Sequence, residues 1–140
     1  MTSYLERIKT EGSRANPFFS LMGIEVMAIE DSRALLRMNV RKDMYNGVGW
    51  LQGGIFTALA DEAIALALYT RLTPFEGIAT VSESTSFIRG ARDGSLIAEG
   101  RVIKKGRRVA FAEGEVYTDD NKRMLLSRTS AAFAITEEKR

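Results

Sequence analysis

Apolar positions cluster most densely between residues 55 and 69, the longest such run in the chain. Gly53 and Gly54 precede the run, and Pro74 and Gly77 follow it, which predicts one helix from residue 53 to about residue 70. The run is apolar on nearly every side, so the helix should be buried on most of its surface. It is shorter than the roughly 20 residues of a membrane span and contains two carboxylates, so we expect no membrane partner.

Shorter extended runs on both sides of this helix predict strands. Two runs before the helix are joined by the polar residues 30–33 and predict a hairpin, and four more follow the helix, so the predicted strands are residues 24–29, 34–40, 78–88, 95–104, 109–117 and 123–134. One long helix with two strands before it and four after it predicts an α+β fold, in which an antiparallel sheet of about six strands wraps around the helix.

Two short helices are predicted before the first strand. Residues 3–10 form the first, capped by Thr2 or Ser3, with Glu6 placed to complete a capping box. Asn16 and Pro17 then start a second helix that ends near Gly23. Residues 41–51 are predicted to form a loop.

Composition narrows the class of protein. A chain of 140 residues, 45% of them apolar, can bury one core, so residues 1–140 are predicted to form a single domain. Lys and Arg total 20 against 18 Asp and Glu, a net charge of +2. That balance is far from the strongly basic one of a nucleic-acid binder, so no nucleic-acid partner is expected.

The sequence contains no Cys and no His. Disulfides, thiolate zinc sites, Cys nucleophiles, imidazole metal sites and a Ser-His-Asp triad are therefore excluded, and no metal is expected. The first residues lack the basic and apolar regions of a signal peptide, so we expect a cytoplasmic protein. Carboxylates are the side chains left for catalysis.

Asp61 and Glu62 are the ionisable residues of the apolar run, and burying a carboxylate there costs several kcal/mol unless a partner compensates. Helical spacing puts Asp61 on one stripe with Gly54 and Thr57, whose small side chains leave room for a ligand along the helix. Asp61 is therefore either a catalytic carboxylate or a structural one bonded to a neighbouring backbone group. Glu62 points about 80° to 100° away, and we expect it in an ion pair at a rim or interface.

Gly53 and Gly54 would present free N–H groups at the positive end of the helix, as an oxyanion hole requires, although a tight turn before the helix also explains them. Gly53 and Asp61 are eight residues apart, a rise of roughly 12 Å, whereas both must lie about 3 Å from one carbonyl. If both are catalytic, Asp61 must come from a second chain.

Residues 46–61 read N-G-V-G-W-L-Q-G-G-I-F-T-A-L-A-D. This segment resembles the signature of hotdog-fold acyl-CoA thioesterases, in particular the phenylacetate-pathway branch, N-G-x-G-x-x-H-G-G-x-x-x-x-L-x-D. One position departs, because Gln52 stands where that family has His. The resemblance extends over nearly the whole chain and implies a hotdog fold, homodimers that pair into homotetramers, and hydrolysis of an acyl- or aryl-acyl-CoA without a cofactor.

The resemblance also implies residue roles. The Gly53 amide would polarise the thioester carbonyl, Asn46 would help to bind it, and Asp61 of the partner chain would attack it or activate water. Gln52 keeps a hydrogen-bonding side chain but cannot transfer a proton as His does. Thr80 falls near a hydroxyl position that orients the water, for which Ser82 or Ser84 would serve equally.

Substrate contacts are predicted more loosely. A basic cluster could hold the phosphates of CoA, although solvated charges are expected around a turn in any case; its members are Arg89, Arg101, Lys104, Lys105, Arg107 and Arg108. Trp50 and Phe56 either line the acyl pocket or simply pack. A protein that binds acyl-CoA or an acyl carrier without turnover is the alternative function, and a hotdog hydratase or dehydratase ranks last because it normally needs a His.

Overall fold

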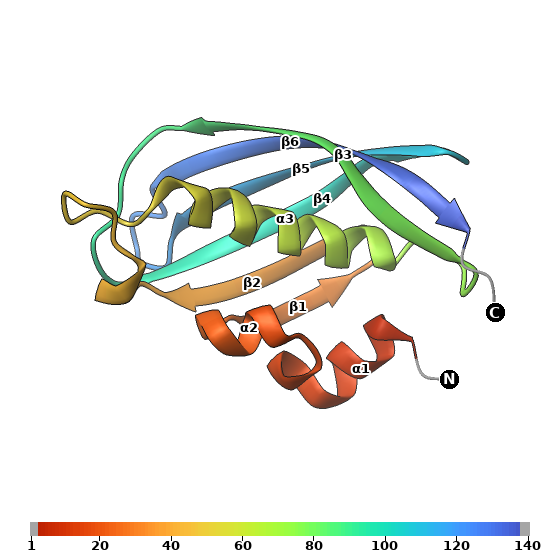
Figure 1. Cartoon of the computed structure of the whole chain (residues 1–140), viewed down its shortest axis with the longest axis horizontal. Helices are drawn as coiled ribbons and strands as arrows, with labels where there is room; N and C mark the ends of the chain where they lie inside the picture. Colours follow the sequence, from red (N-terminus) through yellow and green to blue (C-terminus); the bar gives the residue numbers. More distant parts are fainter. Residues whose placement is uncertain (1–2, 138–140) are drawn as a thin grey trace.

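A six-stranded antiparallel sheet carries one long helix across its face in the computed structural model, which describes residues 3–137 (Figure 1). The helical elements are α1 (Tyr4–Glu11), η1 (Gly12–Ala15), α2 (Pro17–Met22), η2 (Lys42–Met44) and α3 (Gly53–Tyr69). The strands are β1 (Glu25–Glu30), β2 (Arg33–Asn39), β3 (Glu76–Phe87), β4 (Ser95–Lys105), β5 (Val109–Thr118) and β6 (Leu125–Glu137). They lie in the order β1-β2-β4-β5-β6-β3, and every neighbouring pair is antiparallel.

The predicted caps set the N-terminal helices. Ser3 and Glu6 form the capping box of α1, since the Glu6 N–H donates to Ser3 Oγ and the Ser3 N–H donates to Glu6 Oε2. The alternative cap, Thr2, lies outside the described residues. Asn16 Oδ1 accepts from two N–H groups of α2, and Gly23 ends that helix in the left-handed conformation. Both helices then lie beside β1 (Figure 1).

Helix α3 rests directly on β4. A Cβ atom added to Gly100 would lie 2.4 Å from the backbone carbonyl of Ala63 and 2.4 Å from the backbone nitrogen of Ile64. Gly114 of β5 is the register partner of Gly100 and faces the Ile64 side chain and Ala60. Two glycines side by side in the sheet therefore let the helix backbone approach closely, which larger residues would prevent.

The core forms mainly where α3 meets β2, β4 and β5. Alternate residues of β2 (Ala34, Leu36 and Met38) are buried, as expected for a strand with one face on the core. Small side chains fill the contact layer, and its fully buried alanines are Ala60, Ala63, Ala67, Ala98 and Ala110. Close backbone packing thus adds to the burial of large side chains of α3, which include Leu59, Ile64, Leu66 and Leu68.

Strand β3 is an edge strand of 12 residues that pairs with β6 on one side. Its large apolar side chains Val81 and Phe87 are 66% and 58% exposed, and Ile88 beyond it is 47% exposed. A long edge strand with exposed apolar side chains is a surface that proteins normally cover or pair.

The predicted α+β fold and its antiparallel six-stranded sheet are confirmed, and no strand end is shifted by more than three residues. The predicted strand 123–134 begins at Leu125 instead, because Arg123 has a φ of 45° and belongs to the preceding turn. The predicted loop 41–51 contains η2 and a short bridge between Tyr45 and Leu51. Among the helices of residues 3–137, none combines the length and hydropathy needed to span a membrane.

The close approach of α3 to β4 predicts different outcomes for two similar substitutions. Gly100→Ala should lower the free energy of unfolding by about 3 kcal/mol or more, because its Cβ would meet helix backbone that cannot move aside. Gly114→Ala should cost under about 1 kcal/mol, because its Cβ meets the end of the Ile64 side chain at 3.1 Å. Urea denaturation of both variants measures the difference, and equal losses would contradict the proposed packing.

Candidate active site

The loop before α3 is folded around the side chain of Asn46. Its Oδ1 accepts hydrogen bonds from the N–H groups of Val48 (3.0 Å) and Trp50 (3.1 Å), and its own N–H donates to the Trp50 carbonyl (2.7 Å). The Gln52 N–H donates to the Met44 carbonyl at 3.0 Å. Asn46 therefore shapes the loop that leads into α3, and its amide nitrogen remains available to a ligand.

The first turn of α3 leaves two backbone donors open. The N–H groups of Gly53 and Gly54 donate to no group within residues 3–137, as expected at a helix start. A Cβ on Gly53 would lie 3.5 Å from the Phe87 ring, an ordinary contact, so nothing within the chain requires glycine there. A Cβ on Gly54 would lie 2.8 Å from Gln52 Oε1, so the Gln52 carboxamide sits beside the open amides.

Asp61 lies in the middle of α3 and is partly buried. Its Oδ1 is fully buried and has no hydrogen-bond partner among the described residues. The structural alternative predicted that Asp61 would bond to a neighbouring backbone group, and Oδ1 makes no such bond. Asp61 is still about 12 Å along the helix from Gly53, so one chain does not bring both to the same carbonyl.

The register of β3 places a second carboxylate beside α3. Glu83 lies opposite Ala131 of β6, whose side chain belongs to the core under α3, so Glu83 points to the helix side of the sheet. The Glu83 carboxyl lies within hydrogen-bonding reach of the Asp61 carboxyl. Burial, followed by this contact and the charge of Asp61, raises the pKa of Glu83 to about 8.

Glu62 makes contacts other than an ion pair within the described chain, and the predicted ion pair at an interface stays a prediction. Its carboxylate accepts a 3.5 Å bond from Asn16 Nδ2, which also donates to the Tyr4 hydroxyl at 2.8 Å. No Lys or Arg of the described chain lies within ion-pair distance of Glu62. Burial and then the charge of Asp61 raise the pKa of Glu62 to about 7.

The hydroxyl residues of β3 divide between the two faces of the sheet. Thr85 bonds to Thr57 of α3 (2.9 Å) and to Thr129 of β6 (2.8 Å), which forms a chain of three hydroxyls next to Glu83. Thr80 lies opposite the buried Phe133, hence on the same face, although it is itself exposed. Ser82 lies beyond a bulge and, like Ser84, is on the other face, away from α3.

The predicted acyl-pocket aromatics pack within the chain. The Arg92 guanidinium stacks 3.9 Å from the centre of the Trp50 ring, and Gly90 lies against the same ring. Phe56 is 3% exposed and makes an edge contact with Phe87, the ring centres being 6.2 Å apart. Trp50, at 40% exposed, keeps a surface that a ligand could reach, whereas Phe56 belongs to the core.

The predicted basic cluster is partly occupied by acidic partners. Arg101 bonds to Glu99, Glu113 and Glu115, and Lys105 bonds to Glu76. Arg89 donates to the Leu125 carbonyl, and Lys104 is exposed. Arg107 and Arg108 line a hollow of about 960 Å³ with Thr73, Phe75, Glu76, Ile135 and Glu137.

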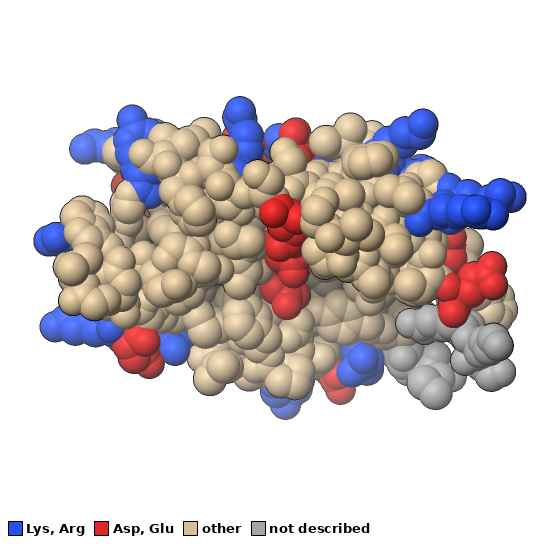
Figure 2. All heavy atoms as spheres, turned by 45° about the horizontal axis from the view of Figure 1, so that its top comes forward, with Lys and Arg blue, Asp and Glu red and all other residues tan. Residues whose placement is uncertain are grey.

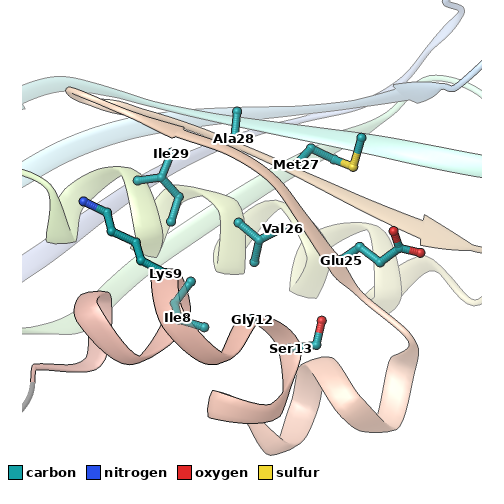
Figure 3. A pocket seen from close by; sticks show the side chains of 9 residues that line it. All are labelled: Ile8, Lys9, Gly12, Ser13, Glu25, Val26, Met27, Ala28 and Ile29. Atoms are coloured by element: carbon teal, nitrogen blue, oxygen red, sulfur yellow. The ribbon is translucent and has the colours of Figure 1, made fainter.

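A second hollow of about 590 Å³ lies between α1 and β1, where Ile8 and Lys9 face Val26 and Ile29 (Figure 3). Neither hollow is lined by Asp61 or Gly53. Within residues 3–137 no three His, Cys, Asp or Glu side chains are grouped to hold a metal ion.

Glu83 is the site residue that the sequence prediction missed. It is the single carboxylate inside a strand segment of Thr and Ser residues, and that isolation was the available signal. The bulge between Thr80 and Ser82 decides which face it occupies, and strand periodicity alone does not reveal a bulge.

A model of the thioesterase superfamily matches residues 49–125. A 1,4-dihydroxy-2-naphthoyl-CoA hydrolase of Listeria monocytogenes is 22% identical over 111 residues, covering 79% of this chain and 90% of that one. A Halobacterium salinarum protein, whose esterase assignment is itself provisional, is 34% identical over 104 residues, covering 71% and 68%.

Solved structures share the fold. A thioesterase from Haemophilus influenzae superposes with a TM-score of 0.85 at 22% identity, covering 100% of this chain and 95% of that one. A mutant of the phenylacetic acid degradation protein of Thermus thermophilus gives a TM-score of 0.77 at 25% identity, covering 85% and 98%. The predicted hotdog fold is confirmed, and so is the predicted resemblance to the phenylacetate-pathway branch of hotdog thioesterases.

The raised pKa of Glu62 predicts that the free energy of unfolding decreases as the pH rises. The folded pKa of about 7 exceeds the ordinary 4.5, so the folded state binds the proton more tightly. The carboxylate then destabilises the fold increasingly as pH rises from about 4.5 to 7, and the full cost remains above that range. Glu62→Gln, which still accepts from Asn16, should stabilise the protein at pH 8 by about 1 to 2 kcal/mol after solvent screening, and hardly at all near pH 4.

Chemical denaturation at several pH values measures this difference. Glu11→Gln, at an exposed position of α1, is the matched control and should give no comparable gain. A Glu62→Gln effect that is the same at every pH would show that ionisation of Glu62 does not matter for stability.

Proposed function

This chain belongs to the thioesterase superfamily, and we propose that it hydrolyses an acyl- or aryl-acyl-CoA thioester to the free acid and CoA. The observation that carries the proposal is Asp61, a carboxylate with a buried, unpartnered oxygen in an apolar helix whose first-turn amides are open. Buried carboxylates are costly and cluster at functional sites. The similarity to a CoA thioester hydrolase agrees with this role.

Hydrolysis needs a donor that polarises the thioester carbonyl and a base that activates water. The thioester carbonyl oxygen would accept from the Gly53 N–H at the positive end of α3, which stabilises the oxyanion that forms on attack. Asp61 would take a proton from water as the water oxygen bonds to the carbonyl carbon, and the C–S bond would then break. The leaving thiolate takes up that proton, so thioester and water give acid and thiol. Direct attack by Asp61, with later hydrolysis of the anhydride, balances equally.

The active site is proposed to combine two chains, because Gly53 and Asp61 are about 12 Å apart along one helix. The exposed edge of β3 offers the pairing surface: two copies would join antiparallel, and the α3 helices would run in opposite directions. Figure 2, which brings the β3 side forward, shows Lys and Arg mainly toward the ends and rim, and a narrow acidic band across an otherwise uncharged middle. We propose a homodimer on this surface, with dimers pairing into a homotetramer.

Side chains near the open amides would orient the substrate. The Asn46 amide nitrogen and the Gln52 carboxamide both lie by the start of α3 and can donate hydrogen bonds. Thr80, on the helix side of β3, is proposed to orient the water. Gly54 and Thr57 would leave space along the helix, and Trp50 would contribute its exposed ring surface.

Phosphates of CoA are proposed to bind near Arg107 and Arg108, which line the hollow of about 960 Å³ and form no ion pair within residues 3–137. Lys104 adds a third cation to the same hairpin. No cofactor is needed beyond the CoA of the substrate. We place the reaction in the cytoplasm, because CoA thioesters are made and used inside cells.

The alternative is a protein that binds acyl-CoA or an acyl carrier without turnover. Gln52 favours it, because the corresponding His of the resembling family is missing. The two functions separate on a hydrolysis screen over short, long and aromatic acyl-CoA esters, in which a binding protein shows affinity without release of thiol.

Replacement of Asp61 tests the function directly. Asp61→Asn keeps the size of the side chain but loses the base, so kcat on the best substrate of the screen should fall at least about a hundredfold. Glu62→Gln is the matched control on the adjacent position and should stay within a few-fold of wild type. An active Asp61→Asn protein would exclude the assigned base.

Subunit mixing tests whether the site is shared. Asp61→Asn and Gly53→Val chains should each be inactive alone, whereas their heterodimer contains one site with an intact Gly53 and an intact Asp61. Activity should therefore rise on mixing toward about half of wild type per heterodimer. Circular dichroism and sizing check Gly53→Val first, because Phe87 lies close to the new side chain. Verified heterodimers without activity would refute a site built from two chains.

A further inference from the structure

Asp61 and Glu83 face each other from α3 and β3, and both belong to the described chain. Asp61 Oδ1 and Glu83 Oε1 are each buried, and neither accepts a hydrogen bond from any N–H or O–H of residues 3–137. The two carboxyl groups nevertheless lie within hydrogen-bonding reach of each other. Two buried acceptor oxygens that face each other repel, so the arrangement is stable only if a hydrogen-bond donor lies between them.

A single proton resolves this arrangement. An ionised carboxylate can only accept, whereas a protonated carboxyl has one O–H donor, so one proton turns repulsion into a hydrogen bond. The proton belongs on Glu83, because the pKa of Glu83 is raised to about 8, by burial first and by Asp61 second. Asp61 is then the acceptor of this hydrogen bond, and its other oxygen remains available for the proposed chemistry.

We propose that Glu83 is a positioning residue of the thioesterase site, whose protonated carboxyl donates a hydrogen bond to Asp61 and holds that carboxylate oriented. The inference rests on the proposed function of Asp61. Glu83 retains its proton throughout the reaction, while Asp61 exchanges protons with water and the leaving thiol. Charge-assisted hydrogen bonds of this kind are short and directional, which suits the positioning of a base.

Among the groups around Glu83, Asp61 is the charged side chain that affects its pKa. On the β6 side the opposite residue is Ala131, and the next polar groups are the hydroxyls of Thr85 and Thr129. On the α3 side the ionisable groups are Asp61 and, next to it, Glu62. No cation of the described chain contributes to the pKa of Glu83. Its ionisation above about pH 8 therefore removes the donor and adds a negative charge beside the developing oxyanion.

Kinetics across pH test the role. For the wild type, kcat should fall about tenfold per pH unit above the pKa of Glu83, as for loss of one required proton. Glu83→Gln, whose amide donates at every pH, should keep kcat within a few-fold at pH 7 and lose this alkaline fall. Glu83→Leu, similar in size but without a donor, should lower kcat about tenfold or more with KM within about threefold. An alkaline fall unchanged in Glu83→Gln, or a fully active Glu83→Leu, overturns the proposal.

Infrared spectroscopy gives a readout that needs no turnover. In a Glu62→Gln background, which removes the other carboxyl of raised pKa, a protonated-carboxyl band should persist above pH 7 and be absent from Glu83→Gln. Adding Asp61→Asn should move its loss to lower pH, because a repelling charge is gone. A chain that shows the band but hydrolyses no acyl-CoA would refute the proposed function alone, whereas hydrolysis without the band would refute the role of Glu83 alone.

Discussion

The contact between α3 and β4 at Gly100 is the constraint on which the rest of the structure depends. The backbone of Ala63 occupies the space where any side chain at position 100 would begin, so the helix axis is fixed at a short distance above the sheet. Helices on sheets usually leave room for a layer of large side chains. Here no side chain separates helix and sheet at Gly100, and the short distance brings the middle of α3 within hydrogen-bonding reach of β3.

That short distance explains why a carboxylate pair can exist in an apolar core. Asp61 reaches β3 because the helix is close, and Glu83 reaches α3 because the bulge after Thr80 sets the register of the strand. Neither residue would meet the other on a helix raised by one more side-chain layer. The same closeness buries one oxygen of each group, so the desolvation that raises the pKa of Glu83 follows from the packing of the backbone.

Sequence patterns predicted most of the fold because the features involved are local. The apolar run of α3, the caps at Ser3 and Asn16 and the glycines between strands act on neighbouring residues, and each had its expected effect. The motif from Asn46 to Asp61 likewise lies in one segment. Glu83, the acceptor from Asn16 at Glu62 and the stacking of Arg92 on Trp50 depend on segments far apart in sequence, which periodicity cannot align. The bulge after Thr80, which strand periodicity does not reveal, explains why Glu83 was missed. The contact of Glu62 with the Asn16 amide was missed because an ion pair was expected there.

The buried alanines and the glycines where α3 meets the sheet also limit how this domain can diversify. Pockets commonly widen in evolution when a large core side chain is shortened, but an alanine can only become glycine, and the glycines of β4 and β5 have nothing left to remove. Descendants of this chain that accept bulkier molecules therefore have to change elsewhere, in the segment from Asn46 to Leu51 or along β3, where exposed side chains can be exchanged without disturbing the core. The interior would stay nearly constant while the periphery drifts, so the family would be recognised by its helix and distinguished by its edges.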